Sequence, residues 1–122
     1  MHRRLAGRMA YLAGEAAEHC VAREYERRGY RVARRRWRGP GGEIDLIIRS
    51  RDALVFVEVK KGRDFACAAQ RVGRRQMDRI CVSAEGFLAD EPAGPPGDVR
   101  FDVALVDGAG AVQIVENAFG PA

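Results

Sequence analysis

The sequence predicts an α/β fold of the α+β type, in which helices flank a mixed five-stranded sheet. Two segments carry apolar residues at helical spacing, and two adjoining segments are rich in Ile, Val, Leu and Phe on both faces of a strand. Turns rich in glycine and proline separate several of these segments. The expected order is α-β-β-β-α-β-β in one domain, residues 1–122, because this length supports a single hydrophobic core.

In the first half of the chain, residues 7–28 predict a long amphipathic helix that ends at Gly29. Residues 30–37 alternate as in a half-exposed strand, which a glycine-proline turn terminates. Residues 43–49 and 53–60 are apolar on both faces, which indicates central strands covered from both sides.

In the second half, we expect an irregular stretch from the basic loop Lys61-Gly62-Arg63 to about Val72. Residues 74–88 then carry apolar side chains at helical spacing, and Gly73 stands at the cap position of this second helix. After a proline-rich loop, residues 99–106 and 111–115 predict a closing hairpin.

The positive charge of the chain comes almost entirely from arginine side chains. The formal net charge is +4, and lysine occurs only at Lys60 and Lys61. Two arginine clusters, at positions 34–38 and 71–79, suit either a phosphate-contacting surface or an ordinary solvated face. Apolar runs are too short for a membrane helix, the N-terminus lacks a signal peptide's apolar region, and the three cysteines match no zinc or disulfide pattern. We therefore expect a cytoplasmic protein without a membrane partner.

The two central strands bring acidic residues together. If Arg51 and Asp52 form a two-residue turn, Asp45 lies opposite Glu58 and Glu43 lies opposite Lys60, all on one face. A different turn length would change this pairing, although Glu58 and Lys60 share a face in any register.

Two facing carboxylates repel each other and need a positive partner inside a sheet. Lys60 can serve one of them, in an ordinary ion-pair cluster. A divalent cation, Mg²⁺ or Mn²⁺, satisfies both, and it binds water and substrate phosphate as well. The arrangement therefore favours a metal site that hydrolyses phosphodiesters, with a lysine amine beside the attacking water.

The string Ile44-Asp45 followed by Glu58-Val59-Lys60 resembles the PD-(D/E)xK nuclease signature, with Ile44 where proline is common. The longer strings at 41–47 and 56–60 resemble the YraN family of bacterial proteins, which is similar to archaeal Holliday junction resolvases. Supporting matches run along the chain: Gly14-x-x-Ala17-Glu18 with Gly29-Tyr30, then Arg100-Phe101-Asp102-Val103, then Glu116-Asn117-Ala118-Phe119.

This resemblance implies a restriction-endonuclease-like core and assigns roles to individual residues. Asp45 and Glu58 are the expected metal ligands, with the Val59 carbonyl as a third, and Lys60 positions the water. A glutamate of the first helix completes such a site. Glu15 and Glu18 are the candidates, and Glu18 has the preferred spacing from Gly29.

Two further residues have supporting roles in this hypothesis. Gln76 matches a position that often carries a polar residue near the site in such nucleases, although an exposed glutamine is an equal alternative. Glu43 is expected as the ionic neighbour of Lys60. The expected nucleic-acid contacts are the basic residues Arg34, Arg35, Arg36, Lys61, Arg63, Arg74 and Arg75.

The function expected from these residues is a metal-dependent endonuclease that cleaves DNA, including branched and other non-standard structures. The alternatives are a nucleic-acid-binding module whose nuclease site is vestigial, and a subunit that works only with a partner through an exposed sheet edge. A homodimer fits either activity, and the sequence leaves the oligomeric state open.

Overall fold

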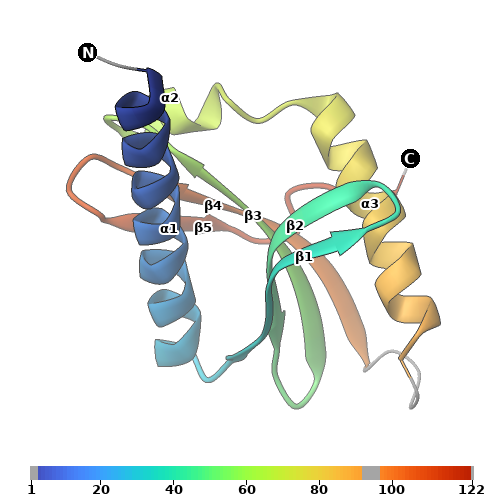
Figure 1. Ribbon diagram of the computed structural model, residues 1–122. Coiled ribbons are helices and arrows are strands. Elements are labelled where there is room, and N and C mark those ends of the chain that lie inside the picture. The colour runs from blue at the N-terminus through green and yellow to red at the C-terminus, as the bar shows by residue number, and fades with distance from the viewer. Residues whose placement is uncertain (1–2, 92–96, 122) are drawn as a thin grey trace.

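A computed structural model describes residues 3–91 and 97–121. A sheet with the strand order β1-β2-β3-β4-β5 lies between two helices, α1 (Arg3–Arg27) and α3 (Arg74–Ala89) (Figure 1). The expected mixed five-stranded sheet with flanking helices is confirmed. No helix in the described ranges is long and apolar enough to cross a membrane.

Three of the four strand pairs in the sheet are antiparallel, and one is parallel. β1 (Arg31–Gly39), β2 (Gly42–Arg49) and β3 (Ala53–Lys61) form an antiparallel meander. β4 (Asp98–Val106) runs parallel to β3, and β5 (Val112–Val115) closes the sheet as the antiparallel hairpin expected there. β3 is therefore the middle strand of the sheet.

The register of the central hairpin agrees with a two-residue turn. The Ser50 amide donates to the Ala53 carbonyl at 2.9 Å, and the pairs run from Arg49↔Leu54 to Leu46↔Val57. The ladder between β2 and β3 ends at that last pair. The two strands consequently separate just before Asp45 and Glu58.

The stretch after β3 is not wholly irregular, so the prediction was wrong there. It contains a short helix, α2 (Phe65–Ala69), which begins where the Asp64 side chain accepts a hydrogen bond of 2.8 Å from the Cys67 amide. Phe65 and Ala68 pack with apolar side chains of β4. A five-residue helix is too short to show a helical period in the sequence.

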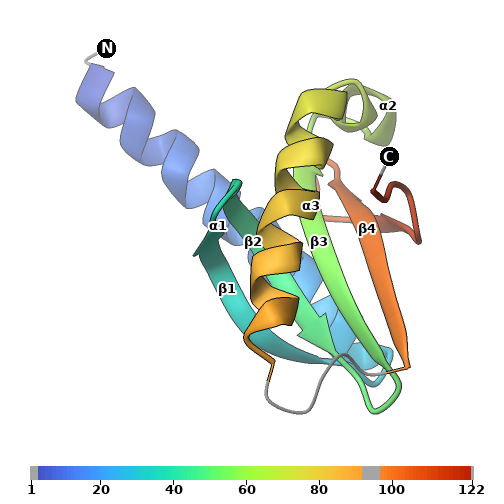
Figure 2. The same ribbon diagram turned by 90° about the vertical axis from the view of Figure 1, so that its right-hand side faces the viewer.

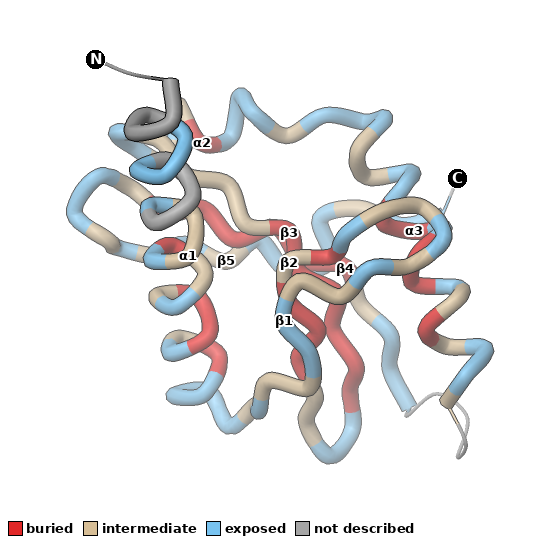
Figure 3. The backbone as a smooth tube through the Cα atoms, in the orientation of Figure 1, coloured by how far each residue is buried: buried red, intermediate tan, exposed pale blue. Residues whose placement is uncertain are grey.

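α1 and α3 cover opposite faces of the sheet (Figure 2), and each face carries its own hydrophobic core. On one face, Val21 and Tyr25 of α1 pack against apolar residues of β2, β3 and β4. On the other face, Ile80 and Phe87 of α3 pack against Phe56 and its neighbours. Burial is concentrated in β2, β3 and β4 (Figure 3), as expected of strands covered from both sides.

The turn between β1 and β2 is attached to α3 by one buried side chain. Ser83 accepts a hydrogen bond from the Gly41 amide at 2.9 Å and donates one to the Gly42 carbonyl at 2.7 Å. A Cβ atom at Gly41 would lie 2.1 Å from the Arg79 carbonyl oxygen, so this close approach requires glycine. The contact fixes the start of β2, the strand that carries Asp45.

Candidate carboxylate–lysine site

The three residues Asp45, Glu58 and Lys60 converge where β2 and β3 separate. They line a cavity of about 160 Å³ together with Glu18 of α1 and Gln76 of α3. The cavity thus collects side chains from both helices and from the two central strands. The structure brings together the residues expected to form the site.

Asp45 replaces a backbone partner at the end of the ladder. Its Oδ2 atom accepts a hydrogen bond of 2.8 Å from the Val59 amide, a group that a continued ladder would have paired with backbone. This bond holds the Asp45 carboxyl beside β3, although the backbones of β2 and β3 are no longer paired at this position. The break in the β2–β3 ladder therefore fixes the position of the Asp45 carboxyl.

Glu58 is a buried carboxyl with another carboxyl next to it. The residue is 2% exposed, and its side chain is within hydrogen-bonding reach of Asp45. Burial, and then the proximity of Asp45, raise the pKa of Glu58 to about 9, although Lys60 opposes this shift. At neutral pH and without a cation, Glu58 thus retains its proton.

Lys60 is held in place by two side chains. Its Nζ atom donates to Gln76 Oε1 at 2.7 Å and lies 3.2 Å from Glu58 Oε2. Gln76 is therefore a structural partner of the lysine and not merely an exposed glutamine. The predicted ion pair between Glu43 and Lys60 is wrong: Glu43 is exposed, and the ladder ends before the two residues can pair.

The glutamate of the first helix that reaches the cavity is Glu18. It lines the cavity, which Glu15 does not. Burial raises the pKa of Glu18, and the negative charges of Asp45 and Glu43 add to that shift, whereas Arg36 lowers it. Glu18 Oε1 accepts a hydrogen bond of 2.8 Å from Arg36 Nε. Of the two candidates, Glu18 is therefore the glutamate at the cavity, and it is paired with Arg36.

That pairing changes the expected role of Arg36. The residue was predicted to contact nucleic acid, but its guanidinium is engaged within the protein by Glu18, and its side chain is 27% exposed. Its backbone has a positive φ of 47°, which is unusual for an arginine. The other expected contact residues remain at the surface: Arg34, Arg35, Arg63, Arg74 and Arg75 are exposed, and Lys61 lines the cavity.

A second cavity meets the first at the carboxyls. Its volume is about 500 Å³, it shares Asp45, Glu58 and Gln76 with the first, and Arg38 and Arg79 also line it. These two arginines were part of the clusters in the sequence but not among the expected contacts. Arg38 lies on β1 and Arg79 on α3, so only the folded chain brings both of them to the cavity of the carboxyls.

Two carboxylates and a carbonyl form the donor set that a cation would meet here. In the described part of the chain, no group of three or more His, Cys, Asp or Glu side chains is arranged to hold a metal ion. Mg²⁺, however, is commonly bound by one or two carboxylates, with water and substrate phosphate as the remaining ligands. The oxygen donors and the retained proton of Glu58 fit a hard divalent cation.

Comparison with known proteins gives a consistent result. The sequence model of "Uncharacterised protein family UPF0102" matches residues 17–106. A UPF0102 protein of Ruegeria pomeroyi is 63% identical over 114 residues, which cover 93% of each chain. A UPF0102 protein of Cereibacter sphaeroides is 56% identical over 94% of this chain and 98% of its own, and one of Dinoroseobacter shibae is 43% identical over 94% and 86%.

Proposed function

The chain belongs to the UPF0102 family of uncharacterised proteins, and we propose that it is a metal-dependent endonuclease that hydrolyses phosphodiester bonds in DNA. The observation that carries the proposal is the pair of adjoining carboxyls, Asp45 and Glu58, beside Lys60 in an open cavity. A restriction-endonuclease-like core is part of the proposal. The mixed sheet between α1 and α3, with the carboxyls on adjacent strands, supports it.

Asp45, Glu58 and the Val59 carbonyl are the groups that would hold the ion. A bound Mg²⁺ or Mn²⁺ supplies charge stabilisation at the scissile phosphate and lowers the pKa of a coordinated water. Glu58 must release its proton when a cation binds, because the cation then supplies the positive charge that the proton supplies in its absence.

Lys60 has the donors needed to orient a water molecule. An ammonium group has three N–H donors. One is used by Gln76, and a second points to Glu58. The third is available for a water or a phosphate oxygen, and the two side-chain partners restrict where it points. Lys60 thus positions the nucleophile, while Gln76 positions Lys60.

Basic side chains on both sides of the carboxyls favour a polyanionic substrate. Lys61 lines the smaller cavity, and Arg38 and Arg79 line the larger one. A phosphate backbone that crosses Asp45 and Glu58 therefore meets positive charge before and after the site. This distribution suits a nucleic-acid strand better than a small neutral substrate.

The proposal is tested with a cleavage assay on linear, nicked, flap, bulged and four-way DNA, with Mg²⁺ and with Mn²⁺. We expect cleavage of at least one structure. Glu58→Ala and Asp45→Ala should each reduce the rate by about 10²- to 10³-fold, because each removes several kcal/mol of transition-state stabilisation.

Glu85→Ala is the matched control, because Glu85 is an exposed glutamate of α3. It should cleave at the wild-type rate. Folded wild-type protein that binds these DNAs but cleaves none of them with either metal would overturn the nuclease proposal and leave the binding-module alternative.

A further inference from the structure

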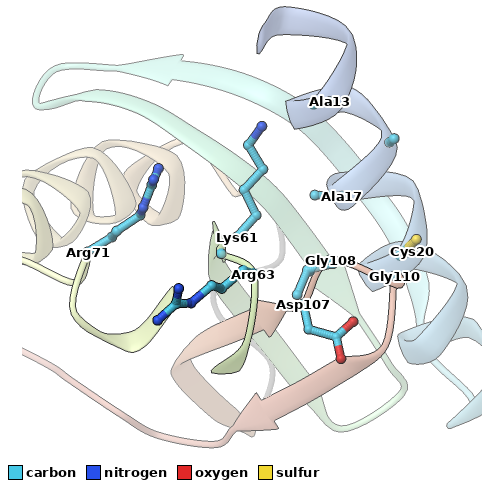
Figure 4. A pocket seen from close by; sticks show the side chains of 12 residues that line it. Ala13, Ala17, Cys20, Lys61, Arg63, Arg71, Asp107, Gly108 and Gly110 are labelled. Atoms are coloured by element: carbon cyan, nitrogen blue, oxygen red, sulfur yellow. The ribbon is translucent and has the colours of Figure 1, made fainter. Parts of the chain in front are cut away.

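A third cavity, of about 470 Å³, opens between α1, the end of β3 and the turn between β4 and β5 (Figure 4). Its volume is within the range of small-molecule sites, roughly 300–1,000 Å³. We propose that it receives one unpaired nucleotide of the DNA strand, adjacent to the bond that is cut. This inference rests on the proposed nuclease function and names its substrate class.

One wall of the cavity is apolar and built from small side chains. Ala13, Ala16 and Cys20 of α1 line it, and Val106 lies at the end of β4. Beside them, Gly108 and Gly110 add only backbone to the wall, and a Cβ atom at Gly110 would lie 3.5 Å from Cys20 Sγ. These small residues leave an open apolar surface, which a flat apolar group such as a nucleobase can cover.

The other side of the cavity is basic. Lys61, Arg63 and Arg71 line it, and in Figure 4 they lie across from the alanines of α1. Arg63 contacts Asp64 at 3.6 Å, but its side chain is 85% exposed, so the pair is weak. The basic rim therefore suits the phosphate of a nucleotide whose base occupies the apolar part.

Among the described residues that line the cavity, Asp107 is the only carboxylate, and it is hydrogen-bonded within the turn between β4 and β5. Asp107 Oδ1 accepts hydrogen bonds of 2.9 Å from the amides of Ala109 and Ala111. These bonds stabilise its negative charge locally. Three cations against one hydrogen-bonded carboxylate leave the cavity positive overall.

The cavity adjoins the proposed catalytic site. Ala17 and Lys61 line both this cavity and the one that holds Asp45 and Glu58. A phosphate at Lys61 therefore lies between a base in one cavity and the carboxyls in the other. Since a paired base is stacked inside the duplex, the base that enters must be unpaired. The geometry points to DNA with an unpaired nucleotide beside the cut.

The experiment compares two DNA hairpins of one sequence, one fully paired and one with a single unpaired nucleotide. Affinity is measured by fluorescence anisotropy in EDTA, so that no cleavage occurs. We expect the wild type to bind the second hairpin about tenfold more tightly. Ala16→Phe should remove this preference by filling the cavity. Arg63→Ala with Arg71→Ala should weaken binding and lower the salt slope by about one per arginine.

Matched controls lie outside the cavity wall. His19→Phe places a phenyl ring at an exposed site of the same helix, and Arg51→Ala removes an exposed arginine at the opposite end of β3. Both should keep the wild-type preference. Circular dichroism and thermal unfolding check the fold of each variant. Ala13→Phe, also in the cavity wall, replaces Ala16→Phe if that variant is unfolded.

Four outcomes overturn the inference: no preference in the wild type, preference retained in folded Ala16→Phe, arginine variants that bind as the wild type does, or equal competition by free thymidine 5′-phosphate at the same nucleotide concentration. The last would assign the cavity to free nucleotides. Asp45→Asn separates the two proposals, since it should lose cleavage but keep the preference. A preference without any metal-dependent cleavage in the wild type would reject only the nuclease proposal.

Discussion

The protein buries carboxyl groups in two places, and the two places are built differently. Asp102 on β4 is fully buried, and both of its oxygens are saturated. Oδ1 accepts from Arg100 Nε at 2.8 Å and from the Asn117 amide at 2.9 Å, while Oδ2 accepts from the Tyr25 hydroxyl at 2.7 Å and Arg100 Nη2 at 3.0 Å. This carboxylate has no capacity left for a ligand.

The carboxyls of Asp45 and Glu58 have fewer donors. In the described part of the chain, Asp45 accepts a hydrogen bond from the Val59 amide, Glu58 faces Lys60 at 3.2 Å, and the two acids lie next to each other. The pKa of Glu58 is raised, and the cavity beside it admits solvent and ligand. Burial alone therefore does not indicate a functional site. A buried acid becomes a candidate for a functional site when its hydrogen bonding is incomplete and it lines a cavity.

The first way to test this contrast is to remove the saturated carboxylate. Asp102→Ala should lower the free energy of unfolding by about 3–5 kcal/mol, because it leaves the partly buried Arg100 guanidinium and the buried Tyr25 hydroxyl without this acceptor. That loss is a large part of a typical total of about 5–15 kcal/mol. Urea unfolding followed by circular dichroism measures it.

Asp98→Ala is the control for this variant, since Asp98 is an exposed aspartate at the start of the same strand. It should change the stability by less than about 0.5 kcal/mol. If Asp102→Ala is no less stable than this control, the Asp102 network does not stabilise the fold and the contrast fails.

The second test concerns the pH dependence of the unsaturated pair. Folding raises the pKa of Glu58 from 4.5 to about 9, so the folded protein holds this proton more tightly than the unfolded chain does. The resulting stabilisation is complete below pH 4.5 and is lost as the pH rises toward 9. In metal-free buffer, the wild type should therefore lose up to about 4 kcal/mol relative to Glu58→Gln between pH 5.5 and 8.5, because glutamine does not ionise.

Glu85→Gln, at an exposed glutamate, should follow the wild-type curve. Millimolar Mg²⁺ at pH 8.5 should restore stability to the wild type but not to Glu58→Gln, because a ligand that binds only the folded state stabilises it. Parallel curves for the wild type and Glu58→Gln would show that Glu58 carries no excess proton in the folded protein.

Much of this arrangement follows from local sequence patterns. Asp45, Glu58 and Lys60 could be predicted to lie together because the turn at Arg51 and Asp52 sets the register of the hairpin. Pairing stops at Leu46, however, because Asp45 takes the Val59 amide in place of a backbone carbonyl. A side chain that ends a ladder leaves no periodic signal, so the error in pairing Glu43 with Lys60 follows from that bond.

Long-range contacts explain what the sequence did not reveal. Arg36 and Glu18 are distant in the chain, and only the packing of α1 against the sheet places them 2.8 Å apart. Likewise, α2 forms because Asp64 caps it and β4 covers it, in a segment too short for a period. The sequence could therefore predict the strands and their chemistry, but not which charges neutralise one another.

The finest test of the contrast removes one hydroxyl from the saturated network. Burial, and then the neighbouring Asp102, raise the pKa of Tyr25 above its usual range, so the phenol remains a donor throughout the accessible pH range. Tyr25→Phe keeps the edge-to-face contact with Tyr30 but removes the 2.7 Å hydrogen bond. We expect a loss of about 1.5 kcal/mol in urea unfolding, typical of a hydrogen bond to a charged group.

Tyr30→Phe is the matched variant, because its hydroxyl receives only a 3.3 Å contact from Arg100 Nη1 and its ring keeps the guanidinium above it. It should cost less than about 0.5 kcal/mol. Equal losses in the two variants would mean that Asp102 gains nothing from its fourth donor. Asp102 would then tolerate an open acceptor position much as Glu58 does, and saturation would no longer separate the structural carboxylate from the proposed functional pair.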